Sequence, residues 1–275
     1  MSRRKRVLAA MVMAPVAIGA VLWLPTALLA ALVAGVMMLA LWEWTLLAGT
    51  TGQTARACYL AANVTVMTAL AWTAGSGFLV LPLTALIGVA WWVLVLVWLM
   101  NFQFAQSNTA GARTLKLVAG SLSVIPAWAA LCWLHGSGPS GPAWALFALF
   151  IVWIADSGAY FVGVRFGKHK LAPRISPGKS WEGFAGGLVA TLLLALVASG
   201  LLGVAWRDLS LLLLLTAVTA LVSVAGDLFE SLLKRHAGAK DSSQLIPGHG
   251  GVLDRMDSLL AALPVFVAGK QWLGL

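Results

Sequence analysis

Nine apolar runs follow one another along this chain, and each is about as long as a bilayer's hydrocarbon core is thick. Short stretches rich in Gly, Pro and charged residues separate them, and they cover approximately residues 7–24, 26–48, 57–74, 78–100, 117–134, 143–164, 184–205, 209–228 and 258–274. A transmembrane helix needs about 20 predominantly apolar residues, and it satisfies its own backbone hydrogen bonds in lipid. The pattern predicts an all-α, polytopic integral membrane protein with about nine transmembrane helices and catalytic loops in the cytoplasm.

The composition excludes a soluble domain and argues against a nucleic-acid partner. The chain is 61% hydrophobic and only 10% charged, whereas about a quarter of the residues in a typical soluble domain are charged. A net charge of +9 is compatible with nucleic-acid binding, but the basic residues stand in short loops between apolar runs. We therefore expect the lipid bilayer, and no nucleic acid, as a partner.

The positions of the basic residues predict the orientation of the chain. With a cytoplasmic N-terminus, nine crossings leave only Arg207 and Lys270, among the 18 Lys and Arg residues, on the outer side. Cytoplasmic loops carry an excess of Lys and Arg. The basic start at Arg3–Arg6 is interpreted as the flank of an uncleaved first helix, because merging the first two spans would place it on the wrong side. We expect a multi-pass protein of a bacterial-type inner (cell) membrane.

Acidic residues divide the chain into two unequal halves. Residues 1–142 hold a single one, Glu43, and the other eight lie in residues 143–275. Two long loops of the second half, 165–183 and 229–257, are both expected in the cytoplasm. We therefore predict N-terminal transmembrane helices over 1–142 and a C-terminal transmembrane catalytic region over 143–275.

The first candidate groups are a carboxylate in the sixth span and the loop that follows it. An ionisable side chain inside a span, here Asp156, is a functional candidate, although pairing with a neighbouring helix is an alternative. The stretch Ser176–Ser180 contains a Pro-Gly turn, whose backbone N–H groups together with Lys179 form a cradle for an oxyanion. Attraction of lipid headgroups to the basic loop is the simpler alternative.

The second candidate groups flank a Gly-rich stretch between the last two spans. Asp227, Glu230 and Lys234 share a helix face, which also fits a plain ion pair at a helix end. Glycines at 248, 250 and 251 let backbone amides approach a phosphate closely. Asp254 and Asp257 stand one helical turn apart, where the helix dipole alone favours carboxylates. Together with Asp227 they also form an oxygen-rich pocket suited to Mg²⁺.

At these residues the chain resembles a known family, the phosphatidate cytidylyltransferases, or CDP-diacylglycerol synthases. The resemblance rests on S-L-L-K-R-x4-K-D-x6-G-H-G-G-x-L-D-R-x-D from Ser231 to Asp257, and on D-S-G-A-Y-F and F-G-K-H-K-L-A-P-x-I-S-P-G-K-S-W-E-G, which begin at Asp156 and Phe166. It covers residues 150–260, and the first 140 residues are similar only in being apolar spans. Many members carry a second Lys where this chain has Gly178.

The resemblance implies an enzyme of phospholipid biosynthesis that uses Mg²⁺ to transfer the cytidylyl group of CTP to phosphatidic acid. CDP-diacylglycerol and pyrophosphate are the products. Asp227 and Asp254 are then the first metal-ligand candidates, followed by Asp257, Asp241 and Asp156. The expected catalytic residues are Asp227, Asp254, Lys234, Arg235 and Asp257. The expected substrate-binding residues are Ser176, Lys179, Lys240, His249, Gly250, Gly251 and Arg255.

Other functions stay open at this point. A CTP-dependent polyprenol kinase would use a similar site but transfer a phosphoryl group. A transporter with Asp156 and Glu43 as ion sites is a non-enzymatic alternative, although the charges gather at one membrane face. A CDP-alcohol phosphotransferase is disfavoured because the chain has no Asp-Gly dipeptide to begin that family's motif. The sequence is compatible with a homodimer as well as with a monomer.

Overall fold

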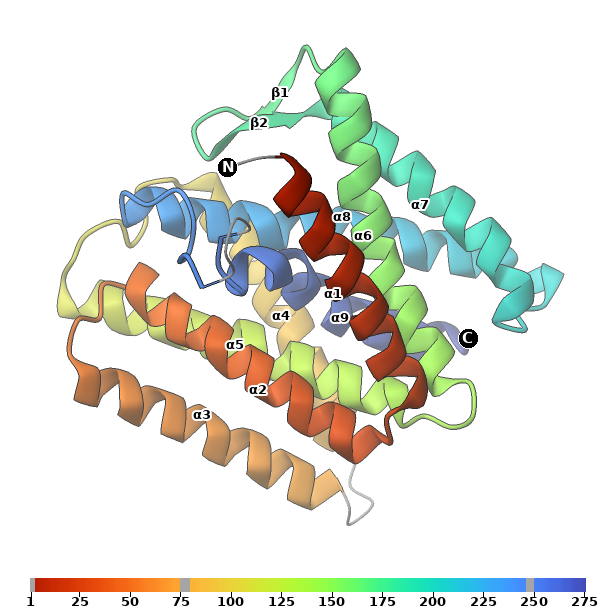
Figure 1. The fold of residues 1–275 in the computed structure, drawn as a ribbon, viewed down its shortest axis with the longest axis horizontal. Helices are drawn as coiled ribbons and strands as arrows, with labels where there is room; N and C mark the ends of the chain where they lie inside the picture. Colours follow the sequence, from red (N-terminus) through yellow and green to blue (C-terminus); the bar gives the residue numbers. More distant parts are fainter. Residues whose placement is uncertain (1–2, 75–79, 246–249) are drawn as a thin grey trace.

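The computed structural model describes residues 3–74, 80–245 and 250–275, with side chains from Met13 onward. Long α-helices dominate this part of the chain, and a short hairpin of two strands interrupts them (Figure 1). In chain order the elements are α1 (Arg3–Trp23), α2 (Thr26–Leu47), α3 (Gln53–Ala74), α4 (Val80–Met100), α5 (Ala110–His135), α6 (Gly141–Phe166), β1 (Lys170–Ala172), β2 (Ser176–Ser180), α7 (Trp181–Leu201), a 3-10 turn (Trp206–Asp208), α8 (Leu209–His236) and α9 (Leu253–Leu273).

The helices confirm a polytopic, all-α membrane protein. Seven of them, α2 to α8, are long and apolar enough to cross a bilayer, and each of the nine predicted spans coincides with a helix to within a few residues at most ends. Nine full crossings stay a prediction, because α1 and α9 are outside those seven. The largest difference is at α8, which continues to His236 instead of ending near residue 228. Phe229, Leu232 and Leu233 explain this extension, since all three are buried.

Successive helices alternate in direction, so that four connections meet at one end of the molecule. There His236 Nε2 donates a hydrogen bond of 2.6 Å to the carbonyl of Phe102, which follows α4. Arg235 Nε donates one of 3.2 Å to the backbone of the β1–β2 hairpin. The α1–α2 and α5–α6 connections meet at the opposite end, where Thr26 Oγ1 lies 2.9 Å from His135 Nδ1. Segments far apart in the sequence therefore come together at one end.

An aromatic cluster fixes the part of α8 that carries acidic residues. The ring of Phe229 is fully buried and lies among four tryptophans of α2 and α4, with centroid distances of 5.2 to 6.1 Å. These tryptophans are Trp44, Trp91, Trp92 and Trp98. Aromatic pairs in such tilted and edge-on arrangements stabilise a core beyond their buried area. The cluster therefore anchors α8 beside Asp227.

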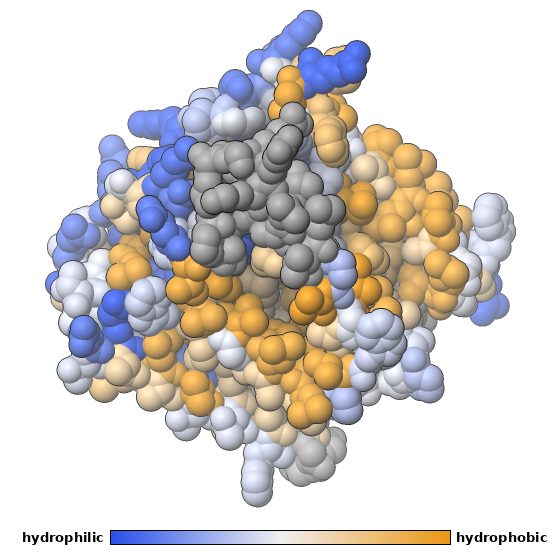
Figure 2. All heavy atoms as spheres, in the orientation of Figure 1, coloured by the Kyte–Doolittle hydropathy of each residue, from blue (hydrophilic) through white to orange (hydrophobic). Residues whose placement is uncertain are grey.

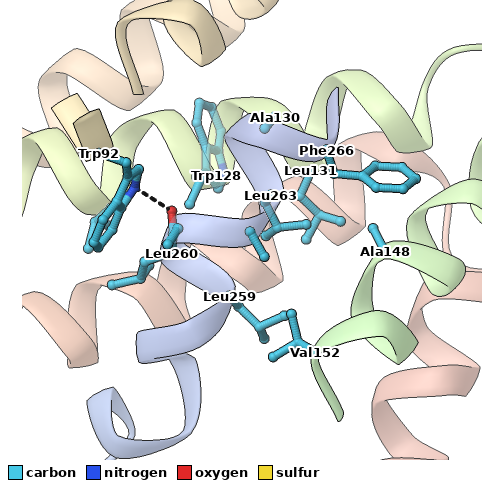
Figure 3. Packing of buried hydrophobic residues seen from close by; sticks show 14 of the residues in the cluster. Trp92, Trp128, Ala130, Leu131, Ala148, Val152, Leu259, Leu260, Leu263 and Phe266 are labelled. Carbon is cyan, nitrogen blue, oxygen red and sulfur yellow. Dashed lines mark hydrogen bonds between the residues drawn. The ribbon is translucent and has the colours of Figure 1, made fainter. Parts of the chain in front are cut away.

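Helix α9 lies in the centre of the bundle. Leu260, Leu263 and Phe266 are almost fully buried, and Trp92 Nε1 donates a hydrogen bond of 3.0 Å to the carbonyl of Leu260 (Figure 3). The outer surface of the molecule, unlike this core, carries both apolar and hydrophilic residues. Apolar residues cover much of the face in Figure 2, and hydrophilic residues gather toward its upper and left edges. Leu94 and Val97 of α4 are more than half exposed, as expected for side chains that face lipid.

Candidate active site

The first part of the site is the β1–β2 hairpin and its contact with α8. Residues 176–180, predicted as a Pro-Gly turn, instead form strand β2, which pairs antiparallel with β1 through Ala172–Ser176 and Lys170–Ser180. That prediction was wrong because the chain reverses earlier, between the two strands. From β2, Lys179 Nζ reaches Asp227 Oδ2 at 2.6 Å. About a quarter of each side chain in this ion pair is exposed.

A cavity of about 480 Å³ opens beside this ion pair. Its polar end is formed by Asp156, Ser176, Lys179 and Asp227, and its apolar walls include Tyr160, Val164, Phe184 and Leu188. Tyr160 and Val164 are 63% and 72% exposed at the outer surface of α6. The cavity thus joins a charged end, where Asp156 is exposed and Lys179 and Asp227 are partly exposed, to an apolar wall that reaches the lipid-facing surface.

Small residues let α6 and α7 approach each other closely beside the cavity. A Cβ on Gly183 would lie 2.8 Å from the carbonyl oxygen of Ala159, and one on Gly187 would lie 2.5 Å from that of Ala155. Such distances are shorter than side chains tolerate, so only glycine allows this approach. Close packing through small residues four apart is a common device of membrane helices. It brings Asp156 to the face of α6 that lines the cavity.

The second part of the site is centred on Lys234, near the end of α8. Its Nζ lies 2.9 Å from Glu230 Oε2 and 2.7 Å from Asp254 Oδ1. Asp254 also accepts hydrogen bonds from the backbone N–H groups of Ser242 and Gly251. Only 11% of the Lys234 side chain and 8% of the Asp254 side chain are exposed. This buried network ties α8 to both sides of the α8–α9 loop.

Three of the predicted metal ligands lie in one region of the molecule. Asp156 and Asp227 line the same cavity, and the backbone of Asp257 packs against Gly226, the residue before Asp227. Carboxylate oxygens are the ligands that Mg²⁺ prefers, and one or two of them suffice when substrate phosphates and waters complete the shell. In the described ranges no three His, Cys, Asp or Glu residues form a ready-made metal-binding group. The donor chemistry still fits Mg²⁺, and a lysine ammonium already neutralises Asp227.

The remaining predicted residues are four charged residues, two glycines and His249. Arg235, Lys240, Asp241 and Arg255 are exposed. His249 lies outside the described residues. Gly250 has a φ of +83°, a conformation that favours glycine, and Gly251 is buried. The substrate-binding and metal-binding roles of these residues stay predictions.

Two glutamates outside the predicted set also organise the site. Glu182, at the start of α7, accepts hydrogen bonds from the backbone N–H groups of Lys168 and His169, and its Oε1 lies 2.6 Å from His169 Nδ1. It therefore fixes the start of the hairpin. Glu43 of α2 is fully buried and contacts the α8–α9 loop. The sequence signal for Glu43 is its position as a lone acidic residue inside an apolar run.

Comparison with known proteins gives a consistent match over nearly the whole chain. A model described as the cytidylyltransferase family matches residues 4–271. A Pseudomonas aeruginosa protein named "Phosphatidate cytidylyltransferase" is 42% identical over 265 residues, which are 96% of each chain. A Haemophilus influenzae protein of the same name is 44% identical over 68% of this chain and 67% of its own length. A Thermotoga maritima protein of that name is 46% identical over 46% of this chain and 48% of its own.

Proposed function

The chain belongs to the cytidylyltransferase family, and from this premise we propose that it is a phosphatidate cytidylyltransferase. It transfers the cytidylyl group of CTP to phosphatidic acid and forms CDP-diacylglycerol and pyrophosphate, a step of phospholipid biosynthesis. The observation that carries this conclusion is the 42% identity, over 96% of both chains, to a protein of that name. The shared name of the relatives favours neither a polyprenol kinase nor a transporter.

The reaction requires positioning more than a side-chain nucleophile. An oxygen of the lipid phosphate attacks the α-phosphorus of CTP and forms a new P–O bond. The bond from the α-phosphorus to the oxygen that bridges it to the β-phosphorus breaks, and pyrophosphate leaves with that electron pair. Holding two polyanions in line is the main task, because their charges repel each other. The basic residues around the acidic centre supply this function.

The cavity between α6, α7 and the hairpin suits the lipid substrate. Phosphatidic acid combines a phosphate with apolar chains, and the cavity combines Lys179 and Ser176 with apolar walls. We therefore assign the lipid phosphate to Lys179. Lys240 in the α8–α9 loop and Arg255 in the first turn of α9 are both exposed, and we assign the CTP phosphates to that side. Arg235 is exposed too, but its Nε donates a hydrogen bond to the hairpin.

Magnesium is the cofactor that we propose for this centre. Asp227 is the first ligand, with Asp156 and Asp257 beside it, while Asp254 and Asp241 are further candidates. Mg²⁺, when bound, neutralises phosphate charge and orients the leaving group. The carboxylate of Asp227 would hold the metal when the ammonium of Lys179 pairs with the lipid phosphate instead. Both partners of this ion pair are accessible from the cavity.

We propose that the active site opens to the cytoplasm in the inner membrane, with the N-terminus on the same side. Single cysteines at Gly178 and Gln244, both exposed, are to be introduced in a background that lacks Cys58 and Cys132. An impermeant thiol reagent should not label them in intact spheroplasts, but should label a cysteine at Ser137, at the opposite end. The reverse labelling pattern would overturn this orientation.

A product assay tests the proposed activity. Purified protein in mixed micelles receives CTP, phosphatidic acid and Mg²⁺. We expect CDP-diacylglycerol and pyrophosphate in equal amounts, with no turnover after chelation of the metal. Formation of CDP from CTP would indicate a kinase instead, and no CTP consumption would contradict the proposal.

A further inference from the structure

Glu43 of α2 is a buried carboxylate that holds the α8–α9 loop, which lies far from it in the sequence. Its side chain has no exposed surface. Oε1 accepts hydrogen bonds from Ser243 Oγ at 2.5 Å and from the Val252 N–H at 3.0 Å. Oε2 accepts from Ser242 Oγ at 2.9 Å and from the Leu253 N–H at 2.8 Å. Both oxygens are therefore satisfied by neutral donors.

These contacts cap helix α9 from another helix. The first N–H groups of an α-helix have no partner within it, and Val252, the residue before α9, offers no side-chain cap. Glu43 binds the N–H groups of Val252 and Leu253 in its place. A carboxylate at this position is favoured by the helix dipole, and hydrogen bonds to a charged acceptor are strong. This arrangement explains how the charge is tolerated away from water.

Ser242 connects Glu43 to the buried network of Lys234. The Ser242 hydroxyl lies 2.9 Å from Glu43 Oε2 and 3.1 Å from Asp254 Oδ2. Its backbone N–H donates to Asp254 as well. The two carboxylates thus hold both sides of the loop, one at residues 242–243 and the other at residues 251–253.

The helix that carries Glu43 is itself held firmly. The next residue, Trp44, is 1% exposed and donates a hydrogen bond of 2.8 Å to the carbonyl of Lys116 on α5. Its ring also packs on Phe229 of α8. Because α2 is fixed to both α5 and α8, the carboxylate of Glu43 is a rigid reference point for the loop.

We propose that Glu43 is a positioning residue of the cytidylyltransferase reaction, which holds the α8–α9 loop and the start of α9 in the geometry that receives CTP. It touches no substrate itself. It acts through the backbone of Gly250 and Gly251 and through the side chain of Arg255, all of which belong to the segment that Glu43 fixes. This role rests on the proposed function. It differs from an ion site of a transporter, because hydrogen-bond donors of the loop already occupy both carboxylate oxygens.

The test compares Glu43→Gln, Glu43→Asp and Glu43→Ala with a matched control, Thr45→Val. Thr45 is also fully buried on α2, but its hydroxyl contacts Trp42 and Arg56, away from the loop. Hydrogen–deuterium exchange is measured in detergent for the amides of Val252 and Leu253. Steady-state kinetics are measured with CTP and phosphatidic acid varied in turn.

We expect the exchange of the Val252 and Leu253 amides to accelerate by at least about tenfold in Glu43→Gln and Glu43→Ala, because their acceptor is weakened or lost. The apparent KM for CTP should rise at least about fivefold, and that for phosphatidic acid should stay within about twofold. Glu43→Asp should recover part of both properties. A merely structural role would reduce the active fraction and leave both KM values unchanged.

Unchanged amide exchange and unchanged KM for CTP in Glu43→Gln would overturn the proposal, as would equal rises in both KM values. Should Glu43→Ala fail to fold, the Ser242→Ala, Ser243→Ala double variant removes two donors from the loop instead and is judged by the same criteria. The exchange measurement does not depend on turnover. An inactive wild-type protein with accelerated exchange in Glu43→Gln would therefore refute the proposed function but leave the loop-holding role intact.

Discussion

Two ion pairs, Lys179–Asp227 and Lys234–Asp254, lie in regions of the molecule that are built differently. The first joins a strand to a helix at the edge of a cavity, and about a quarter of each side chain is exposed. The second joins two helices and a loop in a dense hydrogen-bond network, and about a tenth of each side chain is exposed. A substrate or metal can displace partners in the first region at small cost, whereas the second region is arranged to stay closed. The region of Lys179 and Asp227 is therefore suited to exchanging its partners for substrate or metal. The region of Lys234 and Asp254 is suited to supporting the loop.

The largest effect is expected for Asp227→Asn. This change removes the first proposed metal ligand and the partner of Lys179, so turnover should fall by at least about a hundredfold. The protein should remain folded because the ion pair is partly exposed. Turnover and the midpoint of thermal unfolding in detergent measure the two properties. Asp208→Asn is the control, because Asp208 is a partly exposed carboxylate near the other end of α8 that pairs with the exposed Arg207. Near-normal turnover in Asp227→Asn would exclude its metal-binding role.

Lys234→Met should have the largest effect on stability. It keeps most of the side-chain volume but leaves Glu230 and Asp254 without their cation, and loss of one partner from a buried pair costs about 3–5 kcal/mol. Lys179→Met should cost at most about 1 kcal/mol. The free energy of unfolding from SDS titration in mixed micelles checks both values. Equal losses in the two variants would remove the proposed difference between the regions.

A smaller loss of stability is expected for Gly187→Ala on α7. The added methyl would lie 2.5 Å from the carbonyl oxygen of Ala155, so α6 and α7 must move apart, at a cost of about 1–3 kcal/mol. Gly200→Ala on the same helix is the control, because a Cβ there meets no atom within 4 Å. It should stabilise the protein slightly, since alanine favours helix over glycine. Similar unfolding curves for both variants would contradict close α6–α7 packing as the basis of the cavity.

The sequence predicts the helices well because apolar runs and polar interruptions are local signals. The sequence predicts the local structure poorly where contacts between residues outside the same apolar run determine it. The end of α8 lies beyond the apolar run because Phe229 is buried against tryptophans of α2 and α4. Residues 176–180 form a strand because they pair with residues 170–172, a partner that a Pro-Gly pattern does not reveal.

The candidate site shows the same contrast. Asp156 and Lys179 stand in motifs that resemble a family, Asp227 lies four residues before another such motif, and the structure brings all three to one cavity. Glu43 is different, because its contact with Ser242 joins residues 199 apart in the sequence. No local periodicity predicts such a pair. Its isolation among apolar residues indicates importance, but its partners are known only from the fold.

Substrate kinetics of Lys179→Ala and Lys234→Ala, with CTP and phosphatidic acid varied separately, test the division between the two regions most directly. We predict that Lys179→Ala mainly raises the apparent KM for phosphatidic acid, by about tenfold or more, because the charged end of the lipid cavity loses its cation. Lys234→Ala should mainly raise the apparent KM for CTP, because the loop that receives CTP loses its support. If both variants raise the KM of the same substrate by the same factor, a single shared phosphate pocket replaces the two-region account.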